Sequence, residues 1–290
     1  AENKKELEQL RGSKYVQSDT ALTIRAVKQH LKKGRIVLYS GTACQIDGLY
    51  AYLENRYEKQ LYTIDLVCHG VPSPKIYEDY LNYMENKYCS NIKQVFFRNK
   101  EPGWYVFGMK LVFEDGQTYK ATTYEDPYIR GFLRELFLRP SCHQCIYAGI
   151  NRVADITVAD FWGYMDTCWA DRDHDKGISM VMLNTKNGEQ MFSAIKDRLR
   201  VWSRPLQQAV NGNQALRQCF PPSEKREQFW RDYKEKSFSE IIQKYLYSEP
   251  LKNQYHPNLK KRHKQQDLYT LKILPKRIVL KLLGKKCYEK

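Results

Sequence analysis

Hydrophobic and polar positions in the first hundred residues follow two alternating patterns. Short apolar runs predict buried strands at RIVLYS (35–40) and LYTIDLV (61–67), and IKQVFFRN (92–99) is predicted as a third strand. Between and before these runs, apolar residues three and four positions apart predict three helices, with apolar faces formed by Leu22, Val27 and Leu31; by Ile46, Leu49 and Leu53; and by Ile76, Tyr77, Tyr80, Leu81 and Met84. Ser18-Asp19 is predicted to cap the first of these helices and Ser73 the last. The resulting β-α-β-α-β order predicts a parallel sheet with right-handed crossovers.

The pattern changes from Trp104 onwards. Alternating apolar residues flank the turn residues EDG (114–116), which predicts a β-hairpin. Further predicted elements follow in chain order: a helix from Asp126-Pro127, a strand at ADITVAD (154–160), a strand at GISMVMLN (177–184), a helix over 187–200, and peripheral helices over 206–246. The predicted fold class is α/β with mixed α+β character. It has a central, largely parallel sheet with flanking helices, a β-hairpin insertion and a helical C-terminal extension.

Eight cysteines are the strongest chemical signal in the chain. Cys142 and Cys145 form a CxxC after an Arg-Pro corner, which suits a metal ion or a redox pair. Cys44 and Cys68 are each predicted in a loop at the carboxyl end of a strand, where open α/β sheets place their ligands. These four thiols are enough for a 4Fe–4S cluster or a zinc ion. The residues alone leave an alternative open, in which the CxxC is a dithiol pair and Cys44 and Cys68 are structural cysteines. The remaining cysteines have no partner at a useful spacing and are predicted to be structural or exposed. They are Cys89, Cys168, Cys219 and Cys287.

Other residues near these cysteines are candidates for cofactor contacts. The GTACQ segment (41–45) turns into a helix, and its N–H groups favour an anion such as a cluster sulfide, a thiolate or a flavin phosphate. His69 follows Cys68 and is a candidate donor to a cluster sulfur or a flavin, although a lone histidine is more often structural. Asp160 and Trp162 are candidates for lining a cofactor pocket, and Trp162 is equally a candidate for the core.

Charge is concentrated at one end of the chain. Residues 251–290 hold 12 Lys/Arg and 2 Asp/Glu, a net of +10, whereas the first 250 residues hold 36 and 31, a net of +5. The mixed apolar and basic tail suits either peripheral contact with an anionic membrane surface or a solvated, partly disordered segment. Because it has no recognised nucleic-acid-binding fold, nucleic acid is not expected as a partner. The chain lacks an apolar run of the roughly 18–20 residues that span a bilayer, and it starts without a secretory leader, so a cytoplasmic protein is expected, either free or peripheral to the inner face of the membrane.

Several segments, in order along the chain, resemble the coenzyme F420 hydrogenase/dehydrogenase beta-subunit family. They are GSKYVQSD (12–19), GTACQIDGL (41–49), IDLVCHGVPSP (64–74), FRNKEPGW (97–104), LRPSCHQC (138–145), DITVADFWG (155–163) and DKGISMVMLNTKNG (175–188). The chain departs from the family pattern at Ala43, where proline is usual, and at Ala159, where glycine is usual. The resemblance supports dividing the chain into a catalytic, cofactor-binding domain (1–205), a helical extension (206–250) and the basic tail (251–290).

The resemblance implies an iron–sulfur flavoprotein oxidoreductase subunit. It implies a 4Fe–4S cluster on Cys44, Cys68, Cys142 and Cys145, and FAD as the second cofactor. It also implies electron transfer between the cluster and FAD, with hydride transfer to a deazaflavin-like or other substrate. The implied flavin contacts are Ser13, Lys14, Tyr15, Gln17, Ser18, Gly41, Thr42, Gln45 and His69. Relatives commonly carry a ferredoxin-like module before the segment that matches GSKYVQSD, so such a module or a separate redox protein is the expected partner. The alternative is a non-catalytic scaffold with a structural four-cysteine zinc site, possible membrane docking and a link to surface-polysaccharide biosynthesis.

Overall fold

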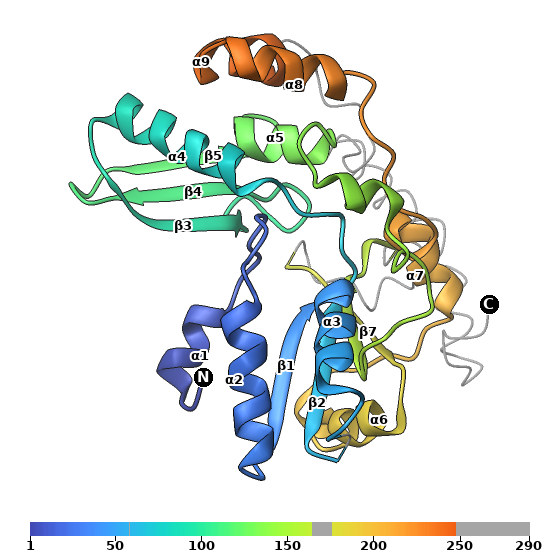
Figure 1. Ribbon diagram of the computed structural model, residues 1–290. Coiled ribbons are helices and arrows are strands. Elements are labelled where there is room, and N and C mark those ends of the chain that lie inside the picture. Colours follow the sequence, from blue (N-terminus) through green and yellow to red (C-terminus); the bar gives the residue numbers. More distant parts are fainter. Residues whose placement is uncertain (58, 164–175, 248–290) are drawn as a thin grey trace, which may run out of the picture.

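Two separate β-sheets organise the protein. The computed structural model describes residues 1–57, 59–163 and 176–247. The first sheet has four strands in the order β1-β2-β6-β7, and the second has three in the order β3-β4-β5. Figure 1 shows the two sheets in different halves of the molecule, with α2, α3 and α6 beside the four-stranded sheet and α4 and α5 beside the three-stranded sheet. This is the mixed α/β architecture that the sequence predicted.

The four-stranded sheet is largely parallel, as expected. β1 (Val37–Thr42) pairs in parallel with β2 (Leu61–Leu66), and β2 pairs in parallel with β6 (Ile156–Asp160). β7 (Ser179–Leu183) closes the edge in the antiparallel direction. Because β1, β2 and β6 run the same way, their carboxyl ends lie at one edge of the sheet, where the chain continues into the segments of the candidate site.

The third predicted parallel strand was assigned to the wrong sheet. β3 (Ile92–Asn99) pairs with β4 (Gly108–Phe113), which pairs with β5 (Thr118–Thr122), and both pairings are antiparallel. β6 occupies the place beside β2 instead. β3 carries Lys93, Gln94 and Arg98, and a strand covered on both faces by helices is usually a continuous apolar run. The predicted hairpin itself is confirmed, because β4 and β5 flank the EDG turn.

Helices cover both sheets, and most begin where the sequence predicted. The described helices are α1 (Lys4–Leu10), α2 (Ala21–Lys32), α3 (Ala43–Leu53), α4 (Pro74–Tyr88), α5 (Pro127–Leu133), α6 (Lys186–Ser193), α7 (Leu206–Gly212), α8 (Arg226–Glu235) and α9 (Phe238–Ile241), with shorter 3₁₀ turns at η1 (Pro140–Gln144), η4 (Lys196–Arg198) and η5 (Gln214–Leu216) and a π-helical turn at η6 (Ile242–Tyr247). Asp126 caps α5 by accepting from the Ile129 N–H at 2.8 Å. None of the helices in the part of the chain described here has the length and apolar character needed to span a bilayer.

The helices after residue 206 contribute to the core, although the sequence had placed them at the periphery. Phe229 of α8, Ile241 of α9, and Ile242 and Leu246 of η6 are buried in the largest hydrophobic cluster, together with side chains of α4, α5 and the three-stranded sheet. The prediction that these helices are peripheral was wrong, because their apolar residues form one face at helical spacing and such a face packs against another surface. The basic tail lies outside the described residues.

A buried carboxylate joins three elements of this core. Asp126 Oδ2 accepts from the hydroxyl of Tyr80 on α4 at 2.7 Å and from that of Tyr119 on β5 at 3.2 Å. Burial raises the pKa of Asp126 to about 6, against the lowering effect of these hydrogen bonds. The carboxylate is therefore less easily ionised in the folded chain than in the unfolded chain.

Asp126 should make the protein less stable as the pH rises. A folded-state pKa above the unfolded value favours folding most below about pH 4, and that advantage is lost as the pH rises through about 6. The ionisation of Asp126 should lower the unfolding free energy by about 3 kcal/mol at most between pH 4 and 7. Asp126→Asn should remove this part of the pH dependence, as measured by urea unfolding. Asp197→Asn on the surface is the control. Equal pH slopes for Asp126→Asn and the parent protein would contradict the expectation.

Candidate functional site

Cys44 lies at the start of a helix rather than in a loop. β1 runs directly into α3, with Thr42 as the N-cap and Gln45 accepting the Thr42 N–H through Oε1 at 2.9 Å. The Thr42 hydroxyl lies 3.1 Å from the Cys44 sulfur. This corrects the predicted loop and puts an exposed thiol beside the N-terminal N–H groups of α3, where negative charge is stabilised.

Cys68 and the CxxC are brought together by backbone pairing between distant segments. Arg139 donates its N–H to Val71 O at 2.8 Å, which places the loop after β2 alongside the chain that enters η1. Gly70 has φ +135°, and a Cβ at this position would lie 2.9 Å from Leu138 Cδ1 and 3.4 Å from Cys142 Cβ. Gly70 thus allows both a backbone conformation and an approach that a larger residue would oppose.

The four thiols come from three segments, and each of Cys68 and Cys142 has a pKa affected by its neighbours. Burial, followed by the nearby thiols of Cys142, Cys44 and Cys145, raises the pKa of Cys68 to about 12. Burial also raises the pKa of Cys142, with further effects from Cys145 and Cys44. The N–H groups of Gly70 and Val71 act in the opposite direction, by donating to the sulfurs of Cys68 and Cys142 respectively. Thiolates here would need a compensating positive charge, which a metal centre supplies.

The four thiols have the right chemistry for a metal centre, but their side chains do not enclose a single ion. In the residues that the structure describes, no three His, Cys, Asp or Glu side chains are grouped closely enough to hold a metal ion. A zinc ion with bonds of about 2.3 Å to sulfur would require all four sulfurs to converge tightly. A four-iron cube holds its cysteine sulfurs farther apart than a single zinc ion does, and the choice between these two centres stays a prediction. N–H donors to cysteine sulfur are also the interactions that tune such clusters.

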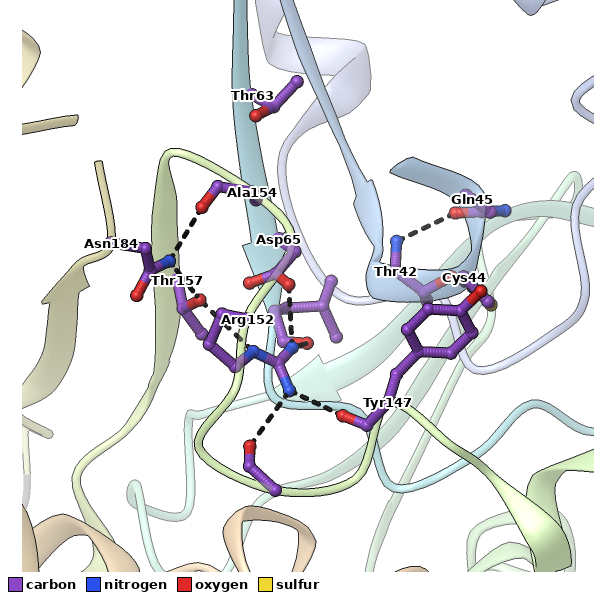
Figure 2. Close-up of polar contacts among 12 residues, drawn as sticks. Thr42, Cys44, Gln45, Thr63, Asp65, Tyr147, Arg152, Ala154, Thr157 and Asn184 are labelled. Carbon is purple, nitrogen blue, oxygen red and sulfur yellow. Dashed lines mark hydrogen bonds and ion pairs between the residues drawn. The ribbon is translucent and has the colours of Figure 1, made fainter. Parts of the chain in front are cut away.

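Arg152 joins the segment after the CxxC to the end of β2, as Figure 2 shows. Its Nη2 lies 2.8 Å from Asp65 Oδ2, and the two side chains are 2% and 0% exposed. The same guanidinium donates to the carbonyl oxygens of Tyr147 at 2.9 Å, Gly149 at 3.4 Å and Leu66 at 3.2 Å. Arg152 therefore fixes the segment that follows Cys145 relative to the strand end that precedes Cys68.

A buried polar network extends this connection across the sheet. Thr157 on β6 accepts from Arg152 Nε at 3.3 Å and from Asn184 Nδ2 at 3.0 Å. Asp155 accepts through Oδ2 from the N–H of Thr63 on β2 at 2.8 Å. Figure 2 also shows the Tyr147 ring beside Cys44, and the Tyr147 hydroxyl donates to Asp47 of α3 at 2.6 Å. The sequence analysis missed this network, although Asp65 inside an apolar strand was a signal that a buried partner must exist.

His69 contacts a carboxylate and two aromatic rings. Its Nε2 lies 3.2 Å from Glu135 Oε1, with both side chains largely buried. The imidazole lies 3.8 Å from the Phe220 ring and 4.8 Å from the Phe132 ring, centroid to centroid. These contacts hold His69 next to Cys68. A role toward a cluster or flavin stays a prediction.

The predicted flavin contacts of residues 13–18 are mostly engaged with the protein itself. Tyr15 is stacked on Phe132 at 4.8 Å, and its hydroxyl bonds to Ser13 and Arg98. Lys14 Nζ donates to three nearby backbone carbonyls, with 3.0 Å the shortest distance. Figure 1 shows this segment running from α1 up to the three-stranded sheet and back to α2.

The other predicted flavin contacts lie near β1 and the loop after β2. Ser18 accepts from Gln45 Nε2 at 2.9 Å, and a Cβ on Gly41 would lie 2.9 Å from Gln45 Oε1. Gln17 is tied to the loop after β2 through its N–H, which donates to Pro72 O at 3.2 Å. Ser18 and Gly41 thus lie beside Gln45, whereas Gln17 lies beside the loop after β2, and their role in flavin binding stays a prediction.

A second set of contacts, which the sequence did not predict, connects the two sheets. Arg98 at the end of β3 lies 3.0 Å from Asp160 at the end of β6, and the Arg98 side chain is 8% exposed. Trp104 Nε1 donates to Asp160 at 2.6 Å and stacks on Trp162 at 4.5 Å. Asp160 and Trp162, predicted as candidates for a pocket, thus take part in contacts between the two halves of the protein. Cys168 and Cys287 lie outside the described residues.

The fold and these contacts define a class: an α/β protein with a cysteine-rich site at the carboxyl edge of a largely parallel sheet. The sequence profile of the family described as the C terminus of the beta subunit of coenzyme F420 hydrogenase/dehydrogenase matches residues 34–209. The chain belongs to this family, which is a family of redox subunits, as its sequence had indicated. No curated protein was matched to the chain in a sequence comparison.

Proposed function

We propose that this chain is an iron–sulfur flavoprotein oxidoreductase subunit with a 4Fe–4S cluster on Cys44, Cys68, Cys142 and Cys145. The observation that carries the proposal is the backbone pairing of the loop after β2 with the chain that enters η1, which puts Cys68 beside the CxxC. The thiol of Cys44, at the start of α3, is near enough to raise the pKa of Cys68 and of Cys142. The cluster, when bound, supplies single-electron transfer, and FAD supplies the conversion between one-electron steps and a hydride.

The residues of the chain have separate roles in this proposal. The N–H groups of Gly70 and Val71 donate to sulfur and stabilise negative charge there. Arg152 holds the segment after Cys145 against the end of β2. Gln17, Ser18, Gly41, Thr42 and Gln45, with Ser13, Lys14, Tyr15 and His69, are proposed to contact or support FAD. A ferredoxin-like module or a separate redox protein is proposed as the electron partner, and a hydride carrier or small molecule as the substrate.

Metal, sulfide and flavin analysis of anaerobically purified protein tests the proposal. We expect about four irons with matching acid-labile sulfide per chain, and a visible absorption that bleaches on reduction. We also expect FAD to be released on denaturation or taken up on reconstitution. One zinc per chain, without sulfide or flavin, would favour the structural zinc scaffold instead. A folded protein that is colourless and free of iron would defeat the proposal.

A further inference from the structure

An open cavity of about 430 Å³ lies beside the turn that carries Cys142. Its walls come from Gln17, the start of α4, the chain that enters η1, and α8. The lining residues are Gln17, Ser73, Pro74, Phe137, Leu138, Arg139, Pro140, Arg226 and Trp230. Five of these present apolar or aromatic surface, and none is acidic. This combination of apolar walls and a few polar groups is typical of a small-molecule site.

Two arginines give the cavity a positive charge. Arg139 is exposed, and its guanidinium makes no hydrogen bond or ion pair within the described residues. Arg226 donates to Leu136 O at 2.8 Å and lies 5.7 Å from the Trp230 ring, with no carboxylate partner in the same part of the chain. Burial lowers the pKa of Arg226, and the nearby Cys142 thiol acts in the opposite direction. An anion in the cavity would add a counter-charge beside both arginines.

Further donors line the same cavity. α4 is a helix of 15 residues whose N-terminus, at Ser73 and Pro74, forms part of the wall, and the Ser73 side chain makes no capping hydrogen bond. The helix dipole favours an anion at the same place.

We propose that this cavity binds a small organic anion, a carboxylate or phosphate carried on a flat apolar body. The aromatic and proline walls, Trp230 among them, would contact the body, and Arg139 and Arg226 would bind the acidic group. Gln17, Arg226 and Trp230 fall outside the family match over 34–209. The identification of this anion as the redox substrate rests on the proposed function. The binding of an anion in the cavity does not.

Calorimetric titration of the full chain with phenyl phosphate tests the proposal. Phenyl phosphate combines one ring with one anionic head, and phenol and inorganic phosphate provide each part alone. We expect phenyl phosphate to bind more tightly than either part. Arg139→Gln should weaken its binding about tenfold, because an exposed guanidinium is lost without disturbing the fold. Arg25→Gln on the exposed side of α2 makes the same change in charge and should leave binding unchanged.

The outcomes separate this inference from the proposed function. No binding of phenyl phosphate, or equal binding by Arg139→Gln and Arg25→Gln, would overturn the inference. A further outcome is that FAD competes with phenyl phosphate in the titration and that Arg139→Gln weakens the binding of both. That result would show that the anion is a flavin phosphate and not the redox substrate. Phenyl phosphate binding to protein that holds neither iron nor flavin would support the cavity and defeat the proposed function.

Discussion

Replacing Arg152 by leucine is expected to lower the free energy of unfolding by about 3–5 kcal/mol, as is typical when one partner of a buried ion pair is removed. The Asp65 carboxylate would stay buried without its counter-charge. The carbonyl oxygens of Tyr147, Gly149 and Leu66 would each lose a donor. Urea unfolding followed by circular dichroism measures the change.

The loss should depend on pH. Burial raises the pKa of Asp65, and Arg152 is among the groups that oppose this rise. Without Arg152 the Asp65 carboxyl would take up a proton more readily, which removes the unpaired buried charge. The destabilisation by Arg152→Leu should therefore be smaller at pH 5 than at pH 8. A loss independent of pH would show that the lost packing and carbonyl contacts, rather than the charge, dominate.

An exposed ion pair in the same chain provides the matched control. Arg56 pairs with Glu54, and the two side chains are 70% and 61% exposed. Arg56→Leu should change the unfolding free energy by less than about 1 kcal/mol, because water solvates both charges. The double variant Arg152→Leu/Asp65→Leu should be more stable than Arg152→Leu alone, since no unpaired charge stays buried. Similar losses for Arg152→Leu and Arg56→Leu would contradict the role given to Arg152.

Local patterns were enough to predict most elements, because each depends on neighbouring residues. The strand before GTACQ, the cap at Asp126 and the EDG hairpin all follow from turn chemistry and periodicity within a few residues. The place of residues 92–99 was predicted wrongly because the choice between two sheets depends on distant strands. Antiparallel pairing with the nearby hairpin needs only a short connection, and sequential strands are commonly neighbours.

The candidate site could be predicted only in its residue types. Cys44 and Cys68 could be named as candidates because strand ends at one edge of a parallel sheet lie close together, and the role of the four cysteines as ligands stays a prediction. The partner of Asp65 could not be named, since Arg152 is 87 residues away and no local spacing links the two. The same holds for Arg98 with Asp160, and for Arg226, which reaches the cavity from a helix beyond the family match.

The four-cysteine set carries the second large effect. Each of Cys44→Ser, Cys68→Ser, Cys142→Ser and Cys145→Ser should remove most of the iron and sulfide from anaerobically purified protein, because a cube with one weak ligand is readily lost. Cys44 is exposed, so its replacement should disturb the fold least and gives the cleanest result. Iron and sulfide content with visible absorption measures the loss, and near-UV circular dichroism checks the fold.

Cys219 is the most demanding control, because it lies beside the CxxC without belonging to the set. Its sulfur donates to His143 O at 3.0 Å, and a serine hydroxyl can make the same contact. Cys89, whose thiol is exposed at the end of α4, is the distant control. Both serine variants should keep full iron content. Retained iron in any of the four variants would remove that residue from the ligand set, and loss of iron in Cys219→Ser would bring a fifth thiol into it. Since sulfur and oxygen differ as ligands far more than as hydrogen-bonding groups, this comparison separates coordination from packing.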